Sequence, residues 1–74
     1  MRVINRLKSF RHKYEMNQTE FADYLGIASD QYNRYERNKR QPVLEIALRI
    51  SERLGVSVNE IFYFTDSDGP PASE

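Results

Sequence analysis

The feature that most constrains the fold is a very short connection between two segments that both have the pattern of a helix. Asn17 can cap the first segment, and Phe21 and Leu25 give it an apolar face. Gly26 is then the expected left-handed stop, and only two residues separate it from Ser29, which can cap the second segment. We therefore predict two helices joined by a sharp turn, the second of them ending near residue 37.

Apolar residues spaced three and four apart predict further helices on both sides of this pair. The first helix is expected over residues 2–14. The fourth is expected over residues 43–54, where a wide apolar arc marks it as the central helix of the core. Ser57 and Glu60 have the pattern of a capping box, so a short fifth helix should reach residue 62 or 63. The predicted fold is all-α, with five helices around one hydrophobic core.

The composition limits what such a domain can contain. The 74 residues include no cysteine and one histidine, so neither a disulfide framework nor a metal cluster is expected. No apolar run approaches the roughly 18 residues that span a bilayer, and the first residues lack the apolar stretch of a signal peptide. We expect a cytoplasmic protein with one domain in residues 1–64, a disordered tail in residues 65–74, and no cofactor or small-molecule ligand.

The charged residues are balanced overall but separated along the chain. Residues 1–15 carry five Lys or Arg and one acid, and residues 31–41 carry four and one. Residues 16–30 hold three acids, and residues 42–74 hold six acids and two bases. If the two basic segments meet on one surface, that face suits phosphates. The alternative is a mixed, solvated surface.

Five short helices with a tight, glycine-containing turn between the second and the third are typical of a helix-turn-helix domain. Residues 17–62 resemble the phage-repressor and Cro family of helix-turn-helix proteins, and the resemblance is carried by the stretches 17–27, 32–42 and 54–62. With the first helix included, it covers residues 2–63. The resemblance implies a five-helix, repressor-like regulator of transcription whose partner is double-stranded DNA.

The third helix is then the recognition helix, whose outer face reads bases in the major groove. Arg34 is the strongest candidate, because a guanidinium can donate two hydrogen bonds to O6 and N7 of guanine. Other donors and acceptors on this face are Ser29, Asp30 and Asn33. Two of them have a structural alternative, because Ser29 can be only a helix cap and Asp30 can serve only the helix dipole.

Contacts with the sugar-phosphate backbone are expected on both sides of this helix. Basic residues follow it, where a loop can run along the backbone and add affinity without specificity: Arg37, Lys39 and Arg40. Asn17 and Gln18 begin the second helix, where Gln18 can bind a phosphate through its amide and the helix N-terminus. The alternatives are a solvated turn for the loop and an ordinary surface role for Gln18.

Two charged residues lie where an apolar residue would be less costly. The resemblance implies that Arg11, near the end of the first helix, contacts Glu36, near the end of the third, as a structural ion pair. Two other positions depart from the family pattern. Tyr32 replaces a branched aliphatic residue, which predicts extra space in the core or a hydroxyl at the surface, and Asn38 replaces a glycine.

The aromatic run at residues 61–64 leads to a prediction about assembly. A domain this small cannot easily bury all of it, so Val58, Tyr63 and Phe64 are candidates for an exposed apolar dimer interface. The alternative is that Tyr63 and Phe64 fold back over the first helix. The resulting hypothesis is a homodimeric repressor that reads a near-palindromic operator, with recognition helices about 34 to 36 Å apart.

A second hypothesis keeps the fold but gives it another task, that of a protein-interaction module such as an antitoxin-like partner or an anti-regulator. An apolar or acidic outer face on the third helix would favour this task, whereas Arg34 and Arg37 favour DNA. An enzyme is the poorest interpretation. The sequence shows no metal cluster, no phosphate-cradling glycine loop, and no plausible pair of nucleophile and base.

Overall fold

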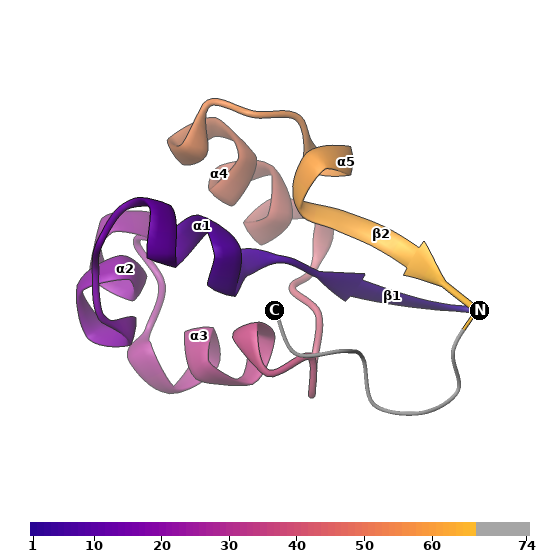
Figure 1. Cartoon of the computed structure of the whole chain (residues 1–74), viewed down its shortest axis with the longest axis horizontal. Coiled ribbons are helices and arrows are strands. Elements are labelled where there is room, and N and C mark those ends of the chain that lie inside the picture. The colour runs from indigo at the N-terminus through magenta and orange to yellow at the C-terminus, as the bar shows by residue number, and fades with distance from the viewer. Residues whose placement is uncertain (67–74) are drawn as a thin grey trace.

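The computed structural model describes residues 1–66, and within this range the chain forms five helices and one two-stranded sheet (Figure 1). The helices are α1 (Leu7–Lys13), α2 (Gln18–Leu25), α3 (Ser29–Glu36), α4 (Leu44–Leu54) and α5 (Val58–Ile61). The strands are β1 (Arg2–Asn5) and β2 (Phe62–Thr65). The predicted all-α class therefore describes the helical part but not the small sheet.

The sheet corrects the prediction at both ends of the domain. Residues 2–5, expected to begin the first helix, form β1, and residues 62 and 63, expected to end the fifth helix, lie in β2. The strands pair antiparallel, with Ile4 opposite Tyr63, and this pairing across the chain overrides the helical spacing of Ile4 and Leu7. β2 continues through Thr65, beyond the expected domain end at 64. Most of the predicted tail, residues 67–74, lies outside the described residues.

The helix ends in the central part of the chain follow the predicted local signals. Asn17 and Glu20 form a capping box at the start of α2, in which the Glu20 N–H donates to Asn17 Oδ1 at 2.8 Å. Gly26 ends α2 with a φ of 74°, in the left-handed region that strains other residues. Asn38 adopts the same region after α3, with a φ of 57°. Gly26 and Asn38 thus reverse the chain where the sequence predicts it, and Glu15, before α2, adopts the same region with a φ of 55°.

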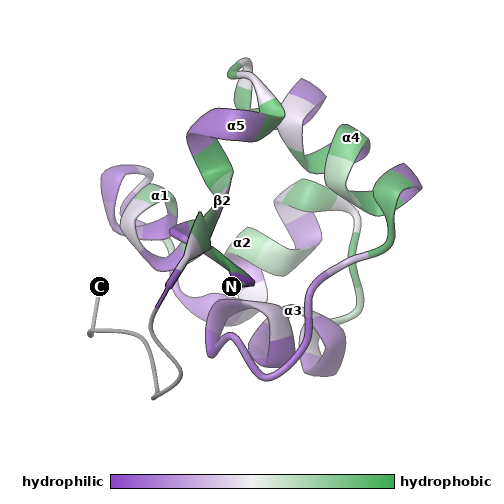
Figure 2. Ribbon diagram, turned by 90° about the vertical axis from the view of Figure 1, so that its right-hand side faces the viewer, coloured by the Kyte–Doolittle hydropathy of each residue, from purple (hydrophilic) through white to green (hydrophobic). Residues whose placement is uncertain are grey.

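One hydrophobic core lies between the helices. Its fully buried side chains include Leu7, Phe21, Leu25, Tyr32, Ile50 and Ile61. Figure 1 shows α1 to α4 packed together, with the ribbon of β1 and β2 extending to one side. In Figure 2, hydrophilic residues follow α3 and the loop after it, whereas hydrophobic residues gather on α4. The fold therefore packs one side of α3 against the hydrophobic core and leaves the other side of α3 polar.

Candidate nucleic-acid interface

The turn between α2 and α3 sets the direction of α3. The Ile27 N–H donates to the Ala22 carbonyl at 2.9 Å, which closes α2 after Gly26 has reversed the chain. Ala22 is buried, so a larger side chain there would push its neighbours apart. At Gly26 a Cβ would meet only Arg53 Nη2, 4.0 Å away. The left-handed φ, rather than a lack of space, therefore requires glycine at this position.

The outer face of α3 carries the predicted base-reading residues. Three are exposed and Asn33 is half-buried: Ser29, Asp30, Asn33 and Arg34. Ser29 was expected to cap the helix, but Ala28 is the N-cap, because its backbone is still extended and Ser29 is already helical. The opposite side of α3 is closed by Tyr32 and Tyr35, both buried. One face of α3 thus exposes polar groups to solvent, and the opposite face packs against the core through two aromatic side chains.

Four cationic side chains are exposed on α3 and in the loop that follows it: Arg34, Arg37, Lys39 and Arg40. Within residues 1–66, none of them takes part in an ion pair or a side-chain hydrogen bond. An unpaired cation at the surface can form charge-assisted hydrogen bonds with an external anion such as a phosphate. This part of the surface therefore suits the backbone of a nucleic acid.

The loop after α3 is fixed by amide side chains that no sequence pattern predicted. Asn5, at the end of β1, is 0% exposed, and its Nδ2 donates to the Tyr35 carbonyl and to Gln41 Oε1, both at 2.8 Å. Asn38 Oδ1 accepts from the Asn5 backbone N–H at 2.8 Å and from Gln41 Nε2 at 2.9 Å. We call Asn5, Asn38 and Gln41 the amide clamp. It attaches the loop that carries Lys39 to β1.

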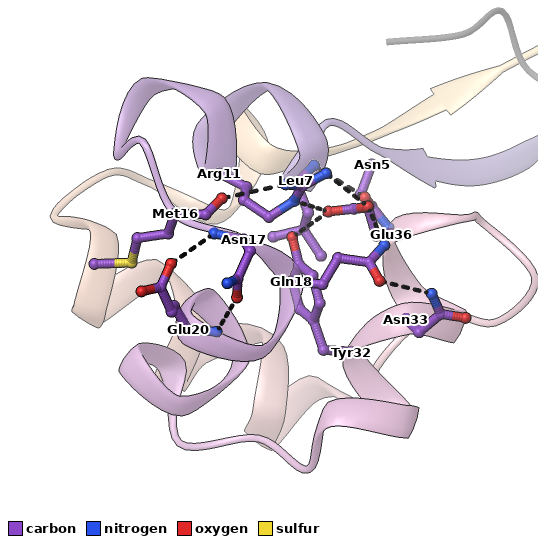
Figure 3. Close-up of polar contacts among 10 residues, drawn as sticks. All are labelled: Asn5, Leu7, Arg11, Met16, Asn17, Gln18, Glu20, Tyr32, Asn33 and Glu36. Carbon is purple, nitrogen blue, oxygen red and sulfur yellow. Dashed lines mark hydrogen bonds and ion pairs between the residues drawn. The ribbon is translucent and has the colours of Figure 1, made fainter.

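Glu36 is the central acceptor of a second polar network, which lies between α1, α2 and α3 (Figure 3). Arg11 Nε and Nη2 donate to its two oxygens at 2.6 and 3.3 Å, which forms the expected ion pair. The Tyr32 hydroxyl donates to Oε2 at 2.7 Å, and Gln18 Nε2 donates to Oε1 at 2.7 Å. The Glu36 side chain is only 4% exposed, so these contacts replace water around the carboxylate.

The network decides the protonation states inside it. Burial alone raises the pKa of a carboxyl, but the hydrogen bonds from Arg11, Tyr32 and Gln18 outweigh it and place the pKa of Glu36 below its ordinary value. Burial and the contact with Glu36 raise the pKa of the Tyr32 hydroxyl, which therefore remains a donor. One alternative predicted that this hydroxyl reaches the surface. That prediction is wrong, because Tyr32 is fully buried. Glu36 satisfies the hydroxyl in the interior.

Gln18 connects this network to Asn33 on the outer face of α3. Its Nε2 donates to Glu36, and its Oε1 accepts from Asn33 Nδ2 at 3.0 Å. Gln18, predicted to contact phosphate, is thus also a bridge between α2 and α3. Asn17 is partly occupied as well, because its Oδ1 caps α2. The type of residue at these positions was visible in the sequence, but the choice of partners depends on packing.

The predicted dimer residues lie on α5 and β2. Phe64 is 67% exposed and lies opposite Val3, which is 37% exposed. Tyr63 is half-buried, and the Arg6 guanidinium carbon lies 4.4 Å from the centroid of its ring. A surface cavity of about 320 Å³ is lined by Val3, Val58, Asn59, Phe62, Tyr63 and Phe64. Phe64 thus stays exposed, whereas Tyr63 is partly covered by the residue that precedes α1.

In the described part of the chain, no three His, Cys, Asp or Glu side chains are grouped so that they could hold a metal ion. Over the same residues, none of the helices combines the length and the apolar character that a membrane span requires.

Comparison with known proteins relates this geometry to a family. The HTH_3 family, described as helix-turn-helix, matches residues 7–61. An uncharacterized HTH-type transcriptional regulator of Methanocaldococcus jannaschii is 30% identical over 64 residues, which cover 86% of this chain and 97% of that protein. The cryptic phage CTXphi transcriptional repressor RstR of Vibrio cholerae is 30% identical over 61 residues, which cover 82% of this chain and 54% of the repressor.

A solved structure has the same fold. The crystal structure of a protein from Bacteroides fragilis matches with a TM-score of 0.71 at 22% identity, and the match covers 84% of this chain and 100% of that one. The family match runs from the first residue of α1 to the last residue of α5 and includes the whole α2–turn–α3 unit. The chain therefore belongs to the HTH_3 helix-turn-helix family of DNA-binding transcriptional regulators.

Proposed function

We propose that the chain is a sequence-specific repressor that places α3 in the major groove of double-stranded DNA. The observation that carries this proposal is the outer face of α3 together with the loop after it, where exposed polar groups and unpaired cations are backed by buried side chains. An α-helix fits the width of the major groove, and its side chains can reach base edges there. Rigid support lowers the entropy that is lost on binding.

The proposed base contacts come from the outer face of α3. Arg34 donates two hydrogen bonds to O6 and N7 of a guanine. Asp30 accepts from a cytosine N4 or excludes other bases by repulsion, since its carboxylate has only acceptors. Ser29 has an exposed hydroxyl that is free of a capping role and can donate or accept. Asn33 is held by Gln18 and supplies a further contact.

The proposed phosphate contacts surround this face. Arg37, Lys39 and Arg40 would bind one strand, with the amide clamp keeping their loop in place. Asn17 and Gln18 would meet phosphate at the start of α2 through the side-chain amide N–H groups that form no hydrogen bond within residues 1–66. Contacts of this kind add affinity for every sequence, whereas the contacts of α3 separate one sequence from another.

Selection of bound sequences from random duplexes, followed by a salt titration on the best site, tests this function. The wild type should enrich one sequence. The logarithm of its affinity should fall linearly with the logarithm of the salt concentration, by a slope of about 0.9 for each phosphate contact. Equal affinity for all duplexes, or no binding even at low salt, would refute the proposal.

We also propose that the chain acts as a homodimer on a near-palindromic operator. The exposed pair Val3 and Phe64, beside the surface cavity that Val58 and Tyr63 help to line, supports an apolar contact at the ribbon of β1 and β2. A contact that uses the same surface on both copies produces two-fold symmetry, which matches a palindromic site. The phage repressor RstR among the relatives supports repression.

Sedimentation velocity at micromolar concentration tests the dimer. The variant Val3→Thr/Phe64→Thr removes the apolar pair and keeps residues that favour strands, and Leu48→Ala is a control at an apolar residue of α4 that is 52% exposed. The wild type and the control should dimerise, whereas the ribbon variant should be monomeric with an unchanged circular dichroism spectrum. A wild type that stays monomeric, both free and on operator DNA, would rule out the homodimer. A ribbon variant that dimerises would move the interface elsewhere.

A further inference from the structure

We infer that Glu36, which does not face the DNA, dictates which atoms Asn33 presents to the major groove and thereby selects adenine over guanine at one operator position. The inference rests on the proposed function and deepens it by assigning a base. It starts from the chain of hydrogen bonds that runs from Glu36 through Gln18 to Asn33, which we call the amide relay.

The direction of the amide relay follows from the chemistry of its first member. An ionised carboxylate has only acceptors, so the Gln18 amide can face it only with Nε2, at 2.7 Å from Glu36 Oε1. This contact turns Gln18 Oε1 toward α3. Because Oε1 is also an acceptor, Asn33 can face it only with Nδ2, at 3.0 Å. Each amide orientation is therefore set by the acceptor that precedes it.

The carboxylate itself cannot rotate away from this arrangement. Arg11 Nε and the Tyr32 hydroxyl both bind Glu36 Oε2, at 2.6 and 2.7 Å, which leaves Oε1 directed at Gln18. A reversed Gln18 amide would place two acceptor oxygens in contact around a side chain that is only 4% exposed. Little water is present there to screen the repulsion. The reversed relay is therefore disfavoured.

The relay leaves Asn33 with Oδ1 and one N–H available to a base. In the major groove, adenine offers the matching pair, an N6 donor and an N7 acceptor. Guanine offers acceptors at N7 and O6, so its O6 would meet Asn33 Oδ1 without a proton between them. An asparagine with a freely rotating amide could turn its N–H groups toward guanine instead. The relay removes this option, and adenine is preferred.

The test compares the selected operator with versions in which each A·T pair is replaced in turn by G·C. The wild type should prefer adenine at the pair read by Asn33 by between about 5-fold and about 150-fold. Gln18→Met removes the relay, keeps a side chain of similar length, and leaves Arg11 and Glu36 in place. It should lower this ratio by about 2-fold to about 12-fold, the effect of releasing one immobilised side chain.

The ratio of the affinities for the A·T operator and the G·C operator separates the relay from the phosphate contact proposed for Gln18. Loss of a phosphate contact lowers the affinity for both operators equally, so it cancels in the ratio. Asn33→Ala should abolish the preference at the same base pair, and adding Gln18→Met to Asn33→Ala should change it no further. A relay that acted only through folding would instead lower both affinities and leave the ratio unchanged. Circular dichroism of every variant serves as the control for folding.

The possible failures are distinguishable. A wild type that selects no sequence would refute the proposed function itself. If the wild type selects a site but Asn33→Ala changes no preference, or Gln18→Met keeps the full ratio, the inference is overturned while the function stands. Nuclear magnetic resonance of the free protein gives an independent measurement. A coupling through the hydrogen bond from Asn33 Nδ2 to the Gln18 amide carbon is expected, and a coupling from Gln18 Nε2 to the Asn33 amide carbon would overturn the inferred direction.

Discussion

Tyr32→Phe deletes one oxygen atom from the interior and tests whether the Glu36 network stabilises the fold. The Tyr32 hydroxyl is buried and donates to Glu36 Oε2 at 2.7 Å. Loss of a hydrogen bond to a charged group costs about 1.5 to 3 kcal/mol. The lower part of this range applies here, because Oε2 keeps its bond from Arg11 Nε at 2.6 Å. We expect the free energy of unfolding to fall by about 1.5 to 2 kcal/mol.

Urea unfolding at pH 7, followed by circular dichroism, measures this loss, and Tyr35→Phe is the matched control. Tyr35 lies on the same helix and is 7% exposed, but its hydroxyl has no hydrogen-bond partner within residues 1–66. Its removal should change the free energy of unfolding by less than about 0.5 kcal/mol. The difference between the two variants therefore isolates the bond to Glu36 from the general effect of replacing tyrosine.

Acid should weaken the effect of Tyr32→Phe. Glu36 has a pKa in the folded protein below its ordinary value of 4.5, so the stability that it contributes is present above this value and is lost as the pH falls through the folded pKa. Protonated Glu36 accepts a weaker bond from Tyr32, and the variant should approach the wild type. Equal urea midpoints for Tyr32→Phe and Tyr35→Phe at pH 7, or a gap to the wild type that does not shrink in acid, would refute the reasoning.

Other substitutions test the proposed contacts and the amide clamp. Arg34→Ala should weaken binding to the selected operator by about 1 to 3 kcal/mol and relax the preference at one base pair in competition assays. A uniform loss for all sequences would contradict its role in base reading. Lys39→Ala should lower the affinity for all duplexes equally and reduce the log-log salt slope by about one unit, and a loss confined to one base pair would argue against a phosphate contact. Asn5→Ala leaves the Leu7 N–H and the Tyr35 carbonyl without the Asn5 side chain and should lower the free energy of unfolding by about 2 to 4 kcal/mol. An unchanged urea midpoint would show that the clamp does not stabilise the fold.

The helical frame was predictable because its signals are local. The capping box of Asn17 and Glu20 depends on residues three positions apart, and the reversal at Gly26 depends on one residue. The sheet depends instead on pairing between the two ends of the described chain, with Ile4 opposite Tyr63. The spacing of apolar residues in one segment holds no information about a partner so distant in sequence.

The candidate site likewise has one part that the sequence predicts and another that only the structure shows. The exposure of Arg34 and of the basic loop follows from helical periodicity and composition. The relay of Glu36, Gln18 and Asn33 does not, because each amide has several possible partners and packing selects one. Tyr32 is an intermediate case. Its departure from the family pattern marked the position as unusual, but only the structure shows that its hydroxyl completes the shell of donors around Glu36.

We expect the amide clamp and the amide relay to support different kinds of the proposed DNA contacts, and the two networks have no residue in common. The clamp holds the loop with Lys39 and should affect affinity, whereas the relay orients Asn33 and should affect base preference. Perturbations without shared partners add in free energy to within about 0.5 kcal/mol. The double variant Asn5→Ala/Gln18→Met should therefore show the affinity loss of the first change and the relaxed adenine-to-guanine ratio of the second. Binding titrations of both singles and the double, on both operators, complete the cycle. A coupling energy clearly above this limit would mean that loosening the loop at the C-terminal end of α3 also changes how Asn33 is oriented.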